Sequence, residues 1–197
     1  KRFVMVGTGR LLDTTDVLSA QQQSFYAIVD GTNARFNAST DLPAGINFPI
    51  TRSNLISGVN GTTFDPASKI GWYIDLGNAA TGARAGYRVL LDATTLAGTV
   101  AFAATLPGGD VCNPSGTTNF YALDYGSTVS AFKNTDGTSL LYVTKNGTGT
   151  DLRFTSVSGT AELLYGIDLP GIGALAISPL QPQSVRRLNW RELQTVE

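Results

Sequence analysis

The chain has 197 residues, a formal net charge of −1 and no histidine. A nearly neutral charge provides no basic surface for nucleic acid, and the lack of histidine removes the commonest general base and the commonest metal ligand. Charged residues make up 15% of the chain, against roughly 25% in an average soluble domain, and 22 residues are glycine. This composition predicts one core built from many strands and turns. No apolar run approaches the roughly 20 residues that a membrane-spanning helix needs.

The N-terminal quarter predicts two strands separated by a bend and a short helix. Residues 3–6 form an apolar run, which the glycines of residues 7–9 interrupt. Residues 13–23 combine apolar and polar positions in a way that predicts a short helix, and residues 25–29 form the next apolar run. Residues 33–49 are polar and contain two prolines and a glycine, which predicts a loop.

The rest of the chain predicts short strands joined by turns. Strands are expected at residues 55–59, 69–76, 87–91, 99–105, 120–123, 129–132, 140–144, 152–157, 163–167 and 174–177. Asn-Gly or Asp-Gly pairs at 60–61, 136–137 and 146–147 predict hairpin turns.

Two further segments have distinct compositions. Proline and glycine at residues 107–110 and 113–116 predict an irregular loop on both sides of Cys112. In the tail, charged and apolar residues alternate over 185–193, which predicts an edge strand whose arginines discourage further pairing.

One pattern occurs four times: an apolar run with a tyrosine near its start, an aspartate near its end and a glycine soon after. The tyrosines are separated by 47, 48 and 44 residues and are Tyr26, Tyr73, Tyr121 and Tyr165. A period near 45 predicts one supersecondary unit per copy. Strand repeats of this period are expected of β-propeller blades, each of which is a four-stranded sheet.

The length of the chain is a little more than four such periods. Four-bladed propellers exist, but six to eight blades are commoner within the range of about four to eight. An incomplete ring would leave large apolar faces uncovered at its ends. We therefore expect residues 1–197 to form a single, partial β-propeller domain, the C-terminal part of a larger protein. The chain enters a strand directly after Lys1 and Arg2, without a signal peptide, which agrees with a boundary inside a longer sequence.

Seven segments share one further feature, and they lie at residues 4–10, 23–31, 71–76, 88–89, 112–116, 120–124 and 190–193. In this order, along nearly the whole chain, they resemble the type IV pilus tip-associated adhesin family of the PilY type. The resemblance implies a modified seven-bladed β-propeller that follows a variable N-terminal region, often with a von Willebrand factor A-like fold. On this basis the chain is an all-β protein that holds the last four or so blades.

The resemblance also implies a function. The family supports pilus assembly, opposes pilus retraction, and mediates attachment to host cells or other surfaces. The expected partners are minor pilins at the pilus tip and a host-cell or abiotic surface, with no nucleic acid and no membrane-spanning segment. The expected location is the bacterial cell surface, at the pilus tip or outer membrane, reached by secretion through the periplasm.

Calcium binding by an acidic loop regulates some members of the family. The nearest candidate here is residues 134–138, where oxygen-bearing side chains alternate. A helix-loop-helix calcium loop needs glycine at its sixth position, and counting back from Gly137 places Phe132, which cannot be a ligand, at the first. This segment is interpreted as a turn, with a metal site as the alternative. The family's calcium loop is expected upstream of Lys1, and no metal or cofactor site is predicted within the chain.

The repeat aspartates and the glycine-rich bend each have two interpretations. The aspartates can form turns at the strand ends, or line a shared cation site if the ends meet; they are Asp30, Asp75, Asp124 and Asp168. The segment Gly7-Thr8-Gly9 is too short for a phosphate loop and lacks the helix with lysine that should follow, so it is interpreted as a strand bend.

Several single residues also carry alternatives. Trp72 and Trp190 either pack between blades or serve as binding anchors. Cys112 is a buried hydrophobe, pairs with a cysteine outside this chain, or is a reactive thiol without a histidine to activate it. The tail arginines form a solvated edge or bind an acidic partner; they are Arg186, Arg187 and Arg191.

No nucleophile, base and oxyanion hole can be assembled from the sequence, and no catalytic residue is predicted. We expect a non-enzymatic, pilus-associated adhesin and type IV pilus biogenesis factor. One alternative is a quinoprotein-dehydrogenase-like propeller enzyme, because the repeated Tyr-x-Leu/Ile-Asp pattern resembles those blades, although their adjacent cysteine pair is missing. The other alternative is a purely structural propeller scaffold that docks minor pilins.

Overall fold

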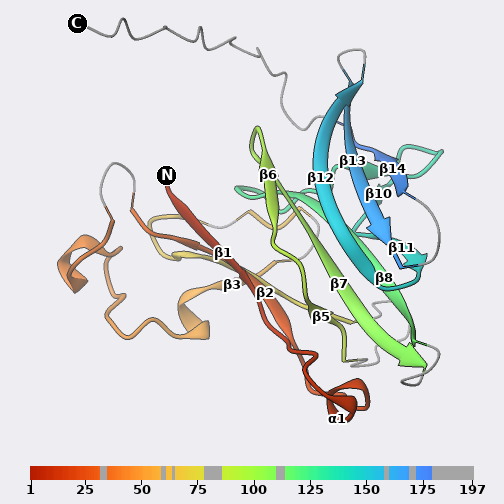
Figure 1. The fold of residues 1–197 in the computed structure, drawn as a ribbon. Helices are drawn as coiled ribbons and strands as arrows, with labels where there is room; N and C mark the ends of the chain where they lie inside the picture. Colours follow the sequence, from red (N-terminus) through yellow and green to blue (C-terminus); the bar gives the residue numbers. More distant parts are fainter. Residues whose placement is uncertain are drawn as a thin grey trace, which may run out of the picture.

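The computed structural model consists mainly of antiparallel sheets that pack face against face (Figure 1). It describes residues 1–31, 35–58, 61–63, 65–77, 86–109, 114–157, 160–168 and 172–178. None of the helices in these ranges is long and apolar enough to cross a membrane.

We refer to three of the sheets as the first, central and third sheets. The first sheet has the order β1-β2-β4-β3, with β1 Phe3–Gly7, β2 Ser24–Val29, β4 Gly71–Asp75 and β3 Ile56–Ser57. The central sheet has the order β11-β8-β7-β5, with β11 Val143–Asn146, β8 Pro114–Asp124, β7 Thr99–Gly109 and β5 Arg88–Val89. The third sheet has the order β12-β13-β14, with β12 Gly149–Val157, β13 Thr160–Ile167 and β14 Ile172–Ala176.

The remaining elements are short. Strand β6, Thr94–Leu96, pairs with β7, and β9, Phe132–Lys133, pairs with β10, Ser139–Leu140. Helix α1 is Thr14–Val17, and two 3-10 turns are η1, Ser39–Asp41, and η2, Arg52–Asn54. The helix predicted within residues 13–23 is therefore present, but it is a single turn.

Strands β7 and β8 are buried on both faces. On one face Phe102 and Tyr121 belong to a core shared with the first sheet, and on the other Ala103 and Phe120 belong to a core shared with the third sheet. The sequences of strands that are buried on both faces are continuous apolar runs rather than alternating patterns. The resulting stack is the all-β, propeller-like fold that the sequence predicts.

Aromatic rings fill the interface between the first and central sheets. Phe102 lies between Phe25, with ring centres 3.8 Å apart, and Tyr121, with ring centres 4.5 Å apart, and both pairs are nearly parallel. Trp72 is completely buried in the same core, and its indole Nε1 donates a hydrogen bond to the Tyr125 carbonyl at 2.9 Å. The interpretation of Trp72 as a packing residue is confirmed.

The prediction of one unit per copy of the repeat is wrong for its first two copies. Tyr26 on β2 lies directly opposite Tyr73 on β4, so both copies belong to the first sheet. The third copy lies on β8 and the fourth on β13, in different sheets. The pattern recurs because each of these strands is buried against a neighbouring sheet, and its period therefore does not count blades. The number of blades stays a prediction.

The loop predicted on both sides of Cys112 is wrong for its described residues. Strand β7 continues to Gly109 and β8 begins at Pro114, and the ladder places Pro107 opposite Gly116. Pairing with the neighbouring strand outweighs the local turn preference of proline and glycine here. Cys112 itself lies outside the described residues.

The stacked rings predict a large cost for truncating Phe102. We expect Phe102→Ala to lower the free energy of unfolding by about 3–5 kcal/mol, because it leaves a cavity between two sheets. Urea denaturation of the full chain measures this change. The matched control is Val4→Ala, at a side chain that is 50% exposed, where we expect a change within about 0.5 kcal/mol. A loss below about 1 kcal/mol for Phe102→Ala would contradict a well-packed interface.

Candidate interaction surface

The structure does not bring the four repeat aspartates together. Asp75 ends β4 opposite Ser24, the first residue of β2, whereas Asp30 follows the other end of β2. Asp75 accepts a hydrogen bond from the Ser24 hydroxyl at 2.6 Å and forms an ion pair with Arg52. Asp30 and Asp75 therefore lie at opposite ends of the first sheet, too far apart to share a cation.

The other two aspartates organise local backbone. Asp124 accepts hydrogen bonds from the amides of Gly126 at 3.0 Å and Ser127 at 2.7 Å, which closes a turn after β8. Asp168 accepts from the Thr148 amide at 2.8 Å and so joins the end of β13 to the start of β12. Within the described residues, no three His, Cys, Asp or Glu side chains gather into a group that could hold a metal ion.

Residues 134–138 form the turn between β9 and β10. The Asp136 carboxylate accepts hydrogen bonds from the Thr138 amide at 2.9 Å and the Thr138 hydroxyl at 2.6 Å, and Asn134 donates to Thr138 Oγ1 at 2.9 Å. The Thr138 hydroxyl holds the pKa of Asp136 below its ordinary value. The Asp136 carboxylate and the Thr138 hydroxyl therefore accept hydrogen bonds from within the turn, which agrees with the interpretation of this segment as a turn.

The segment Gly7-Thr8-Gly9 is a close crossing of β1 over β5. The Val89 amide donates to the Thr8 carbonyl at 3.1 Å. A Cβ atom on Gly7 would lie 2.3 Å from the Val89 Cβ, and one on Gly9 would lie 2.2 Å from the Arg88 Cβ. Glycine is needed here for close packing, which agrees with a bend and not with a phosphate loop. The candidates Arg186, Arg187, Arg191 and Trp190 lie outside the described residues.

Between β1 and β2 the chain leaves the first sheet and returns. We call residues 8–23 the α1 segment; it projects beyond the sheet at the end where β1 finishes (Figure 1). Asp13 caps α1 by accepting from the Thr15 amide at 2.7 Å, and Asp16 accepts in return from the Asp13 amide at 3.4 Å. This reciprocal arrangement is a capping box, which stabilises even a one-turn helix.

A buried arginine on β5 anchors the α1 segment. The Arg88 side chain donates to the carbonyls of Arg10 at 3.0 Å, Asp16 at 2.5 Å and Ser19 at 2.9 Å, and to its own neighbour Gly86 at 3.0 Å. Arg88 is 3% exposed. A buried charge that loses its partners is strongly destabilising, so these bonds hold the segment in one position.

Asp16 ties α1 to the first half of the segment. It is buried, pairs with the Arg10 guanidinium at 2.9 Å, and accepts from the Leu12 amide at 2.8 Å. The Leu12 amide, with help from Arg10, holds the pKa of Asp16 below its ordinary value of 3.8. The hydroxyl and amide of Thr15 lower the pKa of Asp13 in the same way. Both carboxyl groups are therefore ionised at neutral pH.

The anchored segment exposes apolar side chains. Leu12 is 83% exposed and Leu18 is 87% exposed. Together with the end of the β7-β8 hairpin they border an open groove of about 520 Å³. The groove is lined mainly by Leu11, Leu12, Val17, Leu18, Pro107 and Gly108. A rigidly held, exposed apolar surface of this kind is typical of interaction sites.

Sequence reasoning identified none of these residues as functional. The spacing of Asp13 and Asp16 is the signal for a capping box, and the α1 segment exposes Leu12 and Leu18 outside any strand. Arg88 was predicted inside an apolar strand, where a charged residue is a signal for a buried polar anchor. Its partners come from a segment about 70 residues away, which no local pattern reveals.

Comparison with solved structures identifies a related fold. The chain is similar to the crystal structure of the C-terminal domain of Pseudomonas aeruginosa PilY1, with a TM-score of 0.54 and 15% sequence identity. The similarity covers 90% of this chain and 42% of the PilY1 chain. No protein-family model matches the sequence, and no curated protein matches it. The expected resemblance to a PilY-type C-terminal domain is thus confirmed at the level of the fold, over less than half of that structure's length.

Removing the anchor predicts a local loosening. We expect Arg88→Met to speed amide hydrogen exchange across the α1 segment by roughly tenfold or more, because the free energy of local opening becomes smaller there. Exchange in β7 and β8 should change less than in the segment. The matched control is Arg153→Met, because Arg153 has a largely exposed side chain paired with Asp151. If exchange in the α1 segment stays unchanged in Arg88→Met, Arg88 is not the anchor.

The lowered pKa of Asp16 predicts that the stability of the α1 segment falls at acid pH. Its contribution to stability is fully present above the ordinary value of 3.8 and is lost as the pH falls through its lower folded-state pKa. We expect the protection factor of the Leu12 amide to fall across this acid range. Asp16→Asn should remove this dependence, whereas Asp151→Asn should not. A protection factor that is constant on acidification would show that the carboxylate contributes nothing.

Proposed function

We propose that the protein is a non-enzymatic, pilus-associated adhesin and type IV pilus biogenesis factor. The observation that supports this most directly is the fold shared with the PilY1 C-terminal domain over 90% of the chain. The proposal includes a role in attachment to surfaces or host cells and in the balance between pilus extension and retraction.

The arrangement of the described residues supports an interaction role. The repeat aspartates Asp75, Asp124 and Asp168 serve local contacts within the sheets. By contrast, the α1 segment is anchored by the buried Arg88 of β5 and exposes Leu12 and Leu18. Loops held on a rigid scaffold commonly carry binding function, so the α1 segment is the surface that we assign to recognition.

The proposal extends to location and partners. A pilus-associated protein of this kind reaches the bacterial surface through the periplasm, and its partners are minor pilins at the pilus tip and a host-cell or abiotic surface. We assign calcium binding to the longer protein, upstream of Lys1, because Asp124 and Asp136 bind backbone and side chains of their own turns.

The proposal predicts a pilus phenotype. We expect deletion of the gene that encodes the protein to reduce surface pili, twitching motility and attachment, and reintroduction of the gene to restore all three. If the protein opposes retraction, surface pili should also return when retraction is disabled in the deletion strain. Electron microscopy, stab motility assays and adhesion counts measure these outcomes.

Three results would contradict the proposal or part of it. Unchanged pili, motility and attachment in the deletion strain would reject it. Pili whose attachment is unchanged per pilus would favour the purely structural scaffold that docks minor pilins. Robust dye-linked alcohol oxidation by the purified protein with added quinone and calcium would favour the quinoprotein-like enzyme instead.

A further inference from the structure

We propose that the groove beside the α1 segment docks an apolar segment of a partner protein, one that carries a lysine or arginine next to its apolar side chains. This inference rests on the proposed function, because it assumes that the protein acts by binding another protein. It adds the location of the site and the chemistry of the segment that fits it.

The apolar part of the inference comes from the exposed leucines. Leu12 and Leu18 flank α1 and are 83% and 87% exposed. The opposite wall is formed by Pro107 and Gly108, near the end of β7. A groove of about 520 Å³ is within the size range, roughly 300–1,000 Å³, that accommodates a few apolar side chains.

The rigidity of the groove favours binding. One wall is held by three hydrogen bonds of the Arg88 guanidinium to the α1 segment, and the other belongs to the long β7-β8 ladder. A site that is already ordered loses little conformational entropy when a partner docks. The groove is therefore an ordered apolar surface that the described residues leave exposed.

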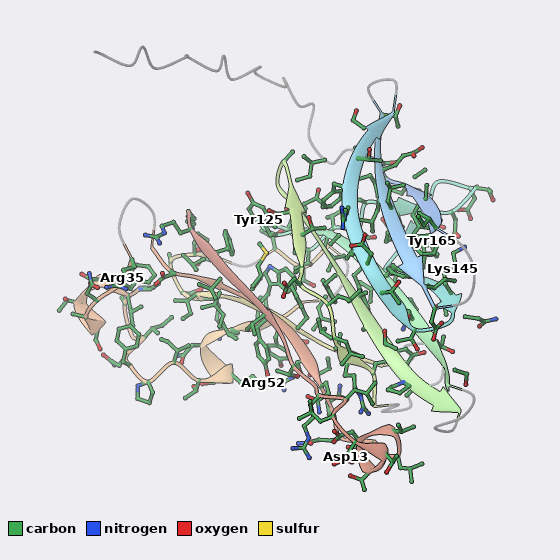
Figure 2. All side chains as sticks on the ribbon, viewed as in Figure 1. Asp13, Arg35, Arg52, Tyr125, Lys145 and Tyr165 are labelled. Atoms are coloured by element: carbon green, nitrogen blue, oxygen red, sulfur yellow. The ribbon has the colours of Figure 1, made fainter. Side chains whose placement is uncertain are left out.

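The charge of the partner follows from Asp13, which is the one charged residue among the described residues that line the groove. Its capping bonds, from Thr15 and from the Asp16 amide, all go to Oδ1. Within the described part of the chain, Oδ2 accepts no hydrogen bond, so it remains available to a partner's ammonium or guanidinium group. Figure 2 shows Asp13 on the projecting α1 segment.

The test uses the purified full chain and two short fluorescein-labelled peptides. Both peptides have the same leucine-containing core, which is flanked by lysine in one peptide and by glutamate in the other. We expect the lysine-flanked peptide to bind more tightly, as measured by fluorescence anisotropy. Leu12→Ser combined with Leu18→Ser should weaken that binding by roughly tenfold or more. The matched control is Ile172→Ser, because Ile172 is 85% exposed on the third sheet and should leave binding unchanged.

A second variant isolates the charge. Asp13→Asn keeps a good helix cap but removes the negative charge, so it should abolish the preference for lysine over glutamate while the leucine-dependent binding persists. Absence of binding to the lysine-flanked peptide, or equal binding by the double serine variant, overturns the inference. Sedimentation that reveals a dimer lost in the double serine variant also overturns it, because the occupant is then a second copy of the chain.

The same variants separate this inference from the proposed function. If gene deletion removes pili or attachment but the double serine variant complements fully, the groove is not the recognition site and the proposed function stands. If the peptides bind as expected but gene deletion has no pilus phenotype, the groove is a docking site and the proposed function is wrong.

Discussion

The double burial of the β7-β8 hairpin is the constraint on which the rest of the structure depends. Adjacent residues of β8 face opposite sheets, and two of them, Thr118 and Asn119, form polar contacts on the two faces. Thr118 donates to the Gly147 carbonyl at 2.7 Å and accepts from the Gly149 amide at 2.9 Å, where the third sheet begins. Asn119, on the other face, accepts from Thr144 at 2.8 Å. Because buried polar groups need their partners, a shift of β8 by one residue would break both contacts and reverse both cores.

The register of the hairpin also positions the candidate surface. Arg88 lies opposite Thr105 of β7, so the pairing of β5 with β7 decides where the guanidinium sits. From there it reaches the α1 segment, while Pro107, two residues beyond Thr105, forms the facing wall of the groove. The core ladder thus sets both sides of the groove, and the Arg88 hydrogen bonds explain how an exposed loop is held in place.

The sequence predicts several elements of this molecule correctly from local patterns, but the hairpin predicted at Asn146-Gly147 is wrong, because β11 pairs with β8 and β12 pairs with β13. All four apolar runs of the repeat are strands, and the turn predicted at Asp136-Gly137 is present. It predicts less where the outcome depends on distant pairing. That two copies of the repeat share one sheet, or that β7 extends through Pro107, follows from neighbouring strands and not from the residues themselves. The anchor Arg88 was missed for the same reason.

The repeat strands and the candidate surface differ in burial, because the repeat strands form the cores and the α1 segment is exposed. Two of the repeat tyrosines, Tyr121 and Tyr165, are buried between sheets, whereas Tyr26 and Tyr73 pack partly buried against the loop side of the first sheet. Burial raises the pKa of Tyr121, which keeps its phenol neutral inside the core. A side chain committed in this way cannot also contact a partner. The proposed recognition surface is instead a segment that leaves the sheets, and such a segment adds specificity only if it is rigid. The α1 segment meets both conditions, because it projects from the first sheet and is fastened by Arg88 to the central one.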